Sequence, residues 1–225
     1  MTISSVLPLL KHLPIRTPSE RRIARRLQAW AAPPHPMPRP TPWAASWETL
    51  HSLCSRIRAS TNPITMAEFG SGVSTAWFAL AVRAAGAGHI HSIEHQARFA
   101  ERTRTLLARQ GVSEHATVHL GHLGASDLND GQPWYDPRCF DAYPTAINLV
   151  FVDGPVAHLG SNIRYPALPT IASRLADRCT VVLDDTHRAE EQGIWQRWGD
   201  ELSDEFVITI EPPLSRSSAM LLQRR

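Results

Sequence analysis

The chain has 225 residues, 43% of them hydrophobic, and a formal net charge of +2 at neutral pH. This length can bury the core of one α/β domain with an extension, but not two such cores. The small charge argues against a nucleic-acid partner. No apolar run reaches the about 20 residues that a membrane-spanning helix needs. Three widely separated cysteines fit neither a disulfide framework nor a zinc site, which predicts a protein of the reducing cytoplasm.

The first 60 residues predict a helical extension with a proline-rich linker, ahead of a domain that spans residues 61–225. Residues 4–13 include a lysine and lack a cleavage-like end, so we expect no signal peptide. Thr17-Pro18-Ser19-Glu20 has the pattern of a capping box and predicts a helix that runs to about residue 31. Residues 33–42 predict a stiff linker. Residues 47–58 predict a second helix, across the sheet edge or the mouth of a ligand site.

From residue 61 onward, short apolar runs alternate with helical patterns, which is typical of βαβ units and a parallel sheet. The last two apolar runs are joined by a short loop with prolines, which indicates an antiparallel hairpin. The sequence therefore predicts an α/β fold. Strands are expected at residues 64–69, 89–93, 116–120, 148–152, 180–183, 206–211 and 219–223, and helices at 74–83 and 96–110.

The stretch from Glu68 to Thr75 reads as a strand end, a glycine turn and a helix start. Gly70 and Gly72 let the backbone approach a ligand closely, and Ser74 or Thr75 can stand in the first helical turn. A dinucleotide fingerprint would place a third glycine at position 75. An anionic pyrophosphate also gains little from Glu68, whereas a ligand with an ammonium or sulfonium group is attracted to its carboxylate.

The pattern Glu68-x-Gly70-x-Gly72-x-Ser74-Thr75 resembles motif I of the class I S-adenosylmethionine-dependent methyltransferases, in the variant with Ser-Thr after the glycines. The resemblance covers roughly residue 61 to the C-terminus. It implies a Rossmann-like fold, with a seven-stranded, mostly parallel sheet that ends in an antiparallel hairpin. It also implies S-adenosylmethionine as cofactor, held by this glycine loop, including Ser71. The alternatives are an NAD-dependent oxidoreductase, which Glu68 and Thr75 disfavour, and a non-catalytic binding module.

Four further residues match positions at which the family binds the nucleoside. Glu94 ends the second expected strand, 24 residues after Gly70, where an acid of the family accepts hydrogen bonds from both ribose hydroxyls. His95 beside it could lie against the adenosine. His122 and Leu123 follow the third strand, where the family flanks the adenine. Many members have an acid at the position of His122, so the contact to the adenine amino group could instead come from the Leu123 backbone.

Acidic residues follow the fourth and fifth expected strands. Asp153 ends the fourth, and Asp184 and Asp185 end the fifth, followed by His187. Because parallel strands end at one edge of the sheet, these side chains should lie close together. The three acids resemble those that hold magnesium in O-methyltransferases of catechol type, where the ion lowers the pKa of the acceptor hydroxyl. Alternatively no metal is used, Asp184 caps the next helix and Asp185 orients His187 as the base.

The remaining candidates concern the methyl acceptor. Arg164 and Tyr165 could reach it from a loop, with Arg164 binding a carboxylate such as that of a uronic acid, or the arginine could simply be packed. Trp134 and Tyr135 could form an aromatic wall of the site or a packed cluster. The resulting expectation is in-line transfer of a methyl group to an oxygen of a small molecule or glycan. Asp153 would contact the methionine end of the cofactor or the acceptor. The sequence does not indicate the acceptor or the oligomeric state.

Overall fold

The computed structural model describes residues 17–38 and 44–225, so the expectation for residues 4–13 and part of the expected linker lie outside the described residues. Seven strands form one sheet in the order β3-β2-β1-β6-β7-β9-β8. β9 runs antiparallel to β7 and β8, and the remaining neighbours are parallel. This confirms the predicted fold. The strands are β1 (Ile64–Phe69), β2 (Gly88–Glu94), β3 (Ala116–Leu120), β6 (Ile147–Val152), β7 (Leu175–Leu183), β8 (Phe206–Ile210) and β9 (Ser218–Arg224).

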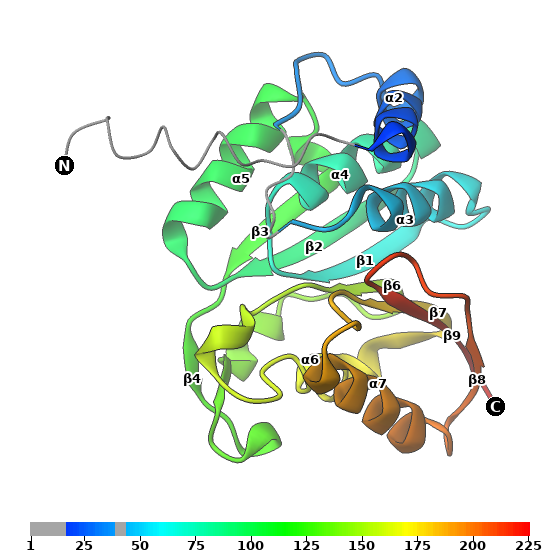
Figure 1. Cartoon of the computed structure of the whole chain (residues 1–225). Coiled ribbons are helices and arrows are strands. Elements are labelled where there is room, and N and C mark those ends of the chain that lie inside the picture. The colour runs from blue at the N-terminus through cyan, green and yellow to red at the C-terminus, as the bar shows by residue number, and fades with distance from the viewer. Residues whose placement is uncertain (1–16, 39–43) are drawn as a thin grey trace.

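Helices cover both faces of the sheet, as Figure 1 shows. One face carries α2 (Pro18–Ala31), α3 (Trp47–Ala59), α4 (Val73–Ala85) and α5 (Ala97–Arg109). The other carries α6 (Ala167–Ile171), α7 (Ala189–Leu202) and a small hairpin of β4 (Leu123–Ala125) and β5 (Pro133–Tyr135). None of the helices in the described part of the chain is long and apolar enough to cross a membrane.

The β4–β5 hairpin is an element that the sequence does not predict. Trp134 and Tyr135, which lie outside the expected strands, belong to β5, where Tyr135 pairs with Leu123 of β4. Strands of three residues are too short to show the alternation of apolar and polar residues from which a strand is inferred. The hairpin places both aromatic side chains in the core beneath the sheet, against Phe69 and Phe140.

The N-terminal helices pack into the same core as the sheet. Thr17 and Glu20 form the predicted capping box: the Thr17 Oγ1 accepts from the Glu20 N–H at 3.2 Å, and Glu20 Oε2 accepts from the Thr17 N–H at 2.7 Å. Leu27 of α2 and Leu53 of α3 are fully buried in one cluster with residues of α4 and β1. Because α3 packs beside α4 on the face of the sheet (Figure 1), it does not lie at the sheet edge.

The shared core predicts that α2 unfolds together with the sheet. Leu27→Ala should lower the free energy of unfolding of the whole chain by about 2–5 kcal/mol, because it leaves a cavity in this core. Urea unfolding followed by circular dichroism should show a single transition at lower urea. Gln28→Ala, an exposed neighbour on the same helix, is the matched control. A separate early transition for α2, with the main transition unmoved, would contradict the prediction.

Candidate functional site

A cavity of about 680 Å³ lies where β1, β2 and β6 end. Backbone hydrogen bonds join these ends: the Gly70 N–H donates to the Ile93 carbonyl at 2.9 Å, and the Asp153 N–H donates to the Phe69 carbonyl at 3.0 Å. The parallel topology thus gathers residues that are far apart in the sequence. Eight of the predicted cofactor residues line the cavity: Glu68, Gly70, Ser71, Gly72, Ser74, Glu94, His95 and Asp153.

The loops after β1 and β6 are in direct backbone contact, and glycine stands at both contact points. A Cβ on Gly154 would lie 3.0 Å from the Cα and N of Gly70, and a Cβ on Gly70 would lie 3.4 Å from the Gly154 N. Gly70 also has a φ of +99°, a conformation that favours glycine. Glycine at both positions is therefore what allows Asp153 to sit beside the glycine loop.

Glu68 is buried beneath the glycine loop and held by the start of α4. Ser74 Oγ donates to Glu68 Oε1 and Thr75 Oγ1 donates to Glu68 Oε2, both at 2.6 Å, while the Gly72 N–H donates to Thr75 Oγ1 at 3.0 Å. Burial raises the pKa of Glu68 to about 7, against the opposing effect of these hydrogen bonds. Thr75 therefore binds the acid and the loop without lining the cavity itself.

Glu94 lies at the end of β2, and its carboxylate is oriented by the loop that follows. The Gln96 N–H donates to Glu94 Oε1 at 2.8 Å, His95 Nδ1 lies 3.2 Å from the same oxygen, and Ser71 Oγ donates to Oε2 at 3.4 Å. These contacts turn the carboxylate toward the glycine loop, at the position predicted for ribose binding. Gln96, Phe99 and Thr103, which the sequence did not single out, also line this part of the cavity.

The structure does not bring His122 and Leu123 to the cavity. The chain turns into β4 after Gly121, so that His122 is exposed with its carbonyl accepting from the Asp136 N–H at 2.9 Å. Leu123 packs against the hydrophobic cluster beneath the sheet. Tyr135, which pairs with Leu123 in the hairpin, lines the cavity instead. The sequence left open whether Trp134 and Tyr135 form a packed cluster or a wall of the site. Both residues are packed in the core, and Tyr135 also forms part of the cavity wall.

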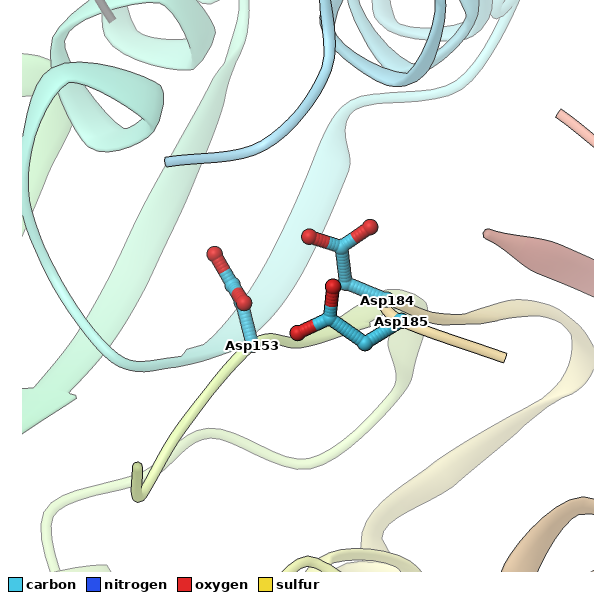
Figure 2. A group of neighbouring side chains, drawn as sticks. All are labelled: Asp153, Asp184 and Asp185. Carbon is cyan, nitrogen blue, oxygen red and sulfur yellow. The ribbon is translucent and has the colours of Figure 1, made fainter. Parts of the chain in front are cut away.

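Asp153, Asp184 and Asp185 lie together as the topology predicts, with one carboxylate oxygen of each within 4.8 Å of the others. Figure 2 shows the three side chains at the ends of the two neighbouring strands. Of the three, only Asp153 lines the cavity. Burial raises the pKa of Asp153 well above its usual range, and the negative charge of Asp184 adds to this effect while Arg164 opposes it.

The guanidinium groups of Arg164 and Arg216 lie beside these acids. Arg164, only 3% exposed, places Nη2 3.3 Å from Asp153 Oδ1 and Nη1 3.4 Å from Asp185 Oδ2. Arg216 Nη2 lies 3.3 Å from Asp184 Oδ2, and Ser217 Oγ donates to Asp184 Oδ1. A divalent cation among the three carboxylates would have to stand beside two positive side chains that repel it. The donor set therefore does not fit the magnesium site that the resemblance implies.

The alternative roles for this segment are not found either. Asp184 does not cap the following helix, because α7 has Arg188 as its N-cap residue, and Asp185 pairs with Arg188 at 3.1 Å as well as with Arg164. His187 is exposed and does not line the cavity. Arg164 does not extend toward an acceptor, since its Nε and both Nη donate to buried carbonyl groups of Pro155, Asp184 and Asp153.

His158 lines the cavity and was missed by the sequence analysis. It lies in a short 3₁₀ helix, Ala157–Leu159, that follows the Asp153-Gly154-Pro155 turn. A single histidine in a loop carries no pattern, and only its five-residue distance from Asp153 could have suggested it. Two neighbouring groups of residues thus line the cavity: the glycine loop with Glu68 and Glu94, and the turn that carries Asp153 and His158.

Comparison with known proteins places this site in a family. Among curated protein sequences, none matches the chain. Solved structures do resemble it: the O-methyltransferase TomG from Streptomyces achromogenes in complex with S-adenosylmethionine has a TM-score of 0.56 at 19% identity, over 99% of this chain and 96% of that chain. The methyltransferase PaMTH1 from Podospora anserina, bound to S-adenosylhomocysteine, has a TM-score of 0.59 at 12% identity, over 95% and 98%. At identities this low, the structural likeness shows that the chains share a fold.

A sequence model of a protein family carries the assignment further. The family described as "Methyltransferase domain" matches residues 67–186, which run from β1 to just beyond β7 and make up more than half of the 225 residues. The match includes the glycine loop, Glu94 and the three aspartates. The chain therefore belongs to the class I S-adenosylmethionine-dependent methyltransferases.

Proposed function

We propose that this methyltransferase transfers the methyl group of S-adenosylmethionine to an oxygen atom of a small molecule or glycan. The observation that carries the proposal is the single cavity that joins Glu68, the glycine loop and Glu94 to Asp153. A third structural neighbour, from Bacillus cereus, is described, like TomG, as an O-methyltransferase, and its structure is in complex with S-adenosylhomocysteine. It has a TM-score of 0.53 at 17% identity, over 98% of this chain and 97% of that chain. Together with TomG, it supports oxygen as the acceptor atom.

In this proposal the residues around the glycine loop bind the cofactor. Glu94 accepts hydrogen bonds from the ribose hydroxyls, and Glu68 attracts the cationic end of the cofactor. Ser71, Gly72 and Ser74 bring the backbone and the start of α4 against the ligand. The cofactor supplies an activated methyl group on a sulfonium that leaves readily, so the protein has to align the two reactants and accept one proton.

The acceptor would lie beside Asp153 and His158. Both side chains line the cavity and can accept a proton from a hydroxyl group. His158 takes the place that the sequence assigned to His187, because His187 does not line the cavity. Asp184 and Asp185 act indirectly in this proposal, because Arg164 links Asp185 to Asp153 and Arg216 pairs with Asp184.

We also propose a cytoplasmic location. Cys54, Cys139 and Cys179 form no disulfide, as expected of a protein from a reducing compartment. The partner is then a soluble acceptor, with no part for nucleic acid, in keeping with the small net charge.

Calorimetric titration tests the cofactor assignment directly. The purified protein should bind S-adenosylhomocysteine with micromolar affinity and should not bind NAD, which separates a methyltransferase from an oxidoreductase. Magnesium should leave the affinity unchanged, because guanidinium groups already face the three carboxylates. NAD binding would favour the oxidoreductase, and absence of any nucleoside binding would contradict the proposal. A screen of hydroxyl-bearing acceptors then separates an enzyme from a binding module.

Glu94→Ala should weaken S-adenosylhomocysteine binding by about 1.5–3 kcal/mol, or roughly 10- to 150-fold, because charged hydrogen bonds to the ribose are lost. The matched control is Glu114→Ala, which removes an exposed acid outside the cavity. The two variants should have similar thermal stability. Equal affinity of the Glu94 variant and the wild type would remove this residue from the site.

Binding of S-adenosylmethionine should release a proton from Glu68. With a pKa of about 7 in the free protein, roughly half of the molecules carry a neutral Glu68 at neutral pH. A cationic ligand stabilises the carboxylate and lowers this pKa, so the affinity should rise as the pH rises toward about 7 and should level off above it. Titrations in buffers with different ionisation enthalpies count the protons released. The release should disappear in Glu68→Gln; release that persists there would assign it to another group.

A further inference from the structure

Tyr135 combines two properties that together indicate a ligand contact. Its side chain is only 1% exposed, and its hydroxyl oxygen has no hydrogen-bond partner among the residues that the structure describes. Buried tyrosine hydroxyls are normally hydrogen-bonded, because leaving one without a partner costs free energy. Yet this side chain also lines the cavity, where a bound molecule could supply the missing partner.

Two other polar aromatic residues of the same cluster have hydrogen-bond partners. Trp134 Nε1 donates to Thr170 Oγ1 at 2.9 Å, and the Tyr143 hydroxyl donates to the His91 carbonyl at 3.3 Å. Neither of these side chains lines the cavity. Within this cluster, the unsatisfied hydroxyl therefore coincides with the side chain that faces the cavity.

The position of Tyr135 indicates which half of the ligand it would meet. A Cβ on Gly121 would lie 2.7 Å from Tyr135 Cδ1 and 2.6 Å from Ile93 Cδ1, which places the ring over the ends of β2 and β3. Glu94, the expected ribose ligand, ends β2. Burial, and in addition the charge of Glu94, raise the pKa of the Tyr135 hydroxyl well above 10, so it is a protonated group that can donate a hydrogen bond.

We propose that the Tyr135 hydroxyl hydrogen-bonds the nucleoside half of the bound cofactor, the half that the family resemblance assigned to His122 and Leu123 among others. This inference rests on the proposed cofactor. Glycine at position 121 leaves room for the Tyr135 ring, because any larger side chain there would collide with it. The hairpin pairs Leu123 of β4 with Tyr135 of β5, and of these two residues only Tyr135 lines the cavity.

Tyr135→Phe tests the inference by removing one oxygen atom. The dissociation constant of S-adenosylhomocysteine should rise about 3- to 10-fold, as expected for one lost hydrogen bond. Methylthioadenosine, which has the nucleoside but not the amino-acid half, should lose affinity by the same factor. The melting temperature of the free variant should be equal to or above that of the wild type, because the unpartnered buried hydroxyl is gone. Tyr143→Phe, which removes a satisfied hydroxyl outside the cavity, should lower the melting temperature and leave both affinities unchanged.

The remaining outcomes overturn the inference in distinguishable ways. Unchanged affinities in Tyr135→Phe would show that the hydroxyl meets no ligand. A loss for S-adenosylhomocysteine without a loss for methylthioadenosine would move the contact to the amino-acid half. Failure of the wild-type protein to bind either compound would overturn the proposed cofactor, and this inference with it, before any variant is made.

Discussion

The backbone contact between Gly70 and Gly154 is the constraint on which the rest of the site depends. It brings the loop after β1 so close to the loop after β6 that a Cβ on Gly154 would lie 3.0 Å from the Gly70 backbone. The loop after β1 forms part of the proposed cofactor site, and the loop after β6 carries Asp153. In-line methyl transfer requires donor and acceptor to be aligned closely. In the proposed reaction, the close approach of these two loops at the edge of the parallel sheet provides that alignment.

The buried charges around Asp153 are the second constraint. Three carboxylates at neighbouring strand ends repel one another, and burial without partners would cost several kcal/mol for each charge. Arg164 and Arg216 offset this repulsion, and Arg164 also donates to three carbonyl groups of the surrounding loops. A guanidinium is permanently charged and planar, so it fixes the positions of the acids at every physiological pH. In this chain, Arg164 and Arg216 hold the acids at the positions where the resemblance to catechol-type enzymes implies a metal ion.

Much of this arrangement could be predicted from the sequence, because it follows from local patterns. Buried parallel strands are apolar runs, and acids at their ends, such as Glu94 and Asp153, must meet at one edge of the sheet. The partners of Arg164 could not be predicted, since they depend on which loop carbonyls face inward. The β4–β5 hairpin could not be predicted either, because its strands are too short to show an alternation of apolar and polar residues. The expectation that His122 and Leu123 flank the adenine came from the family resemblance, and neither residue lines the cavity because the chain enters this hairpin after Gly121.

The N-terminal segment contributes to the site although its sequence carries no motif. Pro38 and Ala44 line the cavity, and the chain is anchored on each side of them. The side chain of Gln110 hydrogen-bonds both the N–H and the carbonyl of His35, and Arg216 donates to the Ala44 carbonyl while it pairs with Asp184.

The same arginine thus connects the acid cluster to a segment at the cavity. Substitutions at Pro38 or Ala44 can therefore change the wall of the cavity without touching the glycine loop. In the proposed reaction, this separation lets the acceptor side of the cavity vary while the glycine loop keeps the cofactor site.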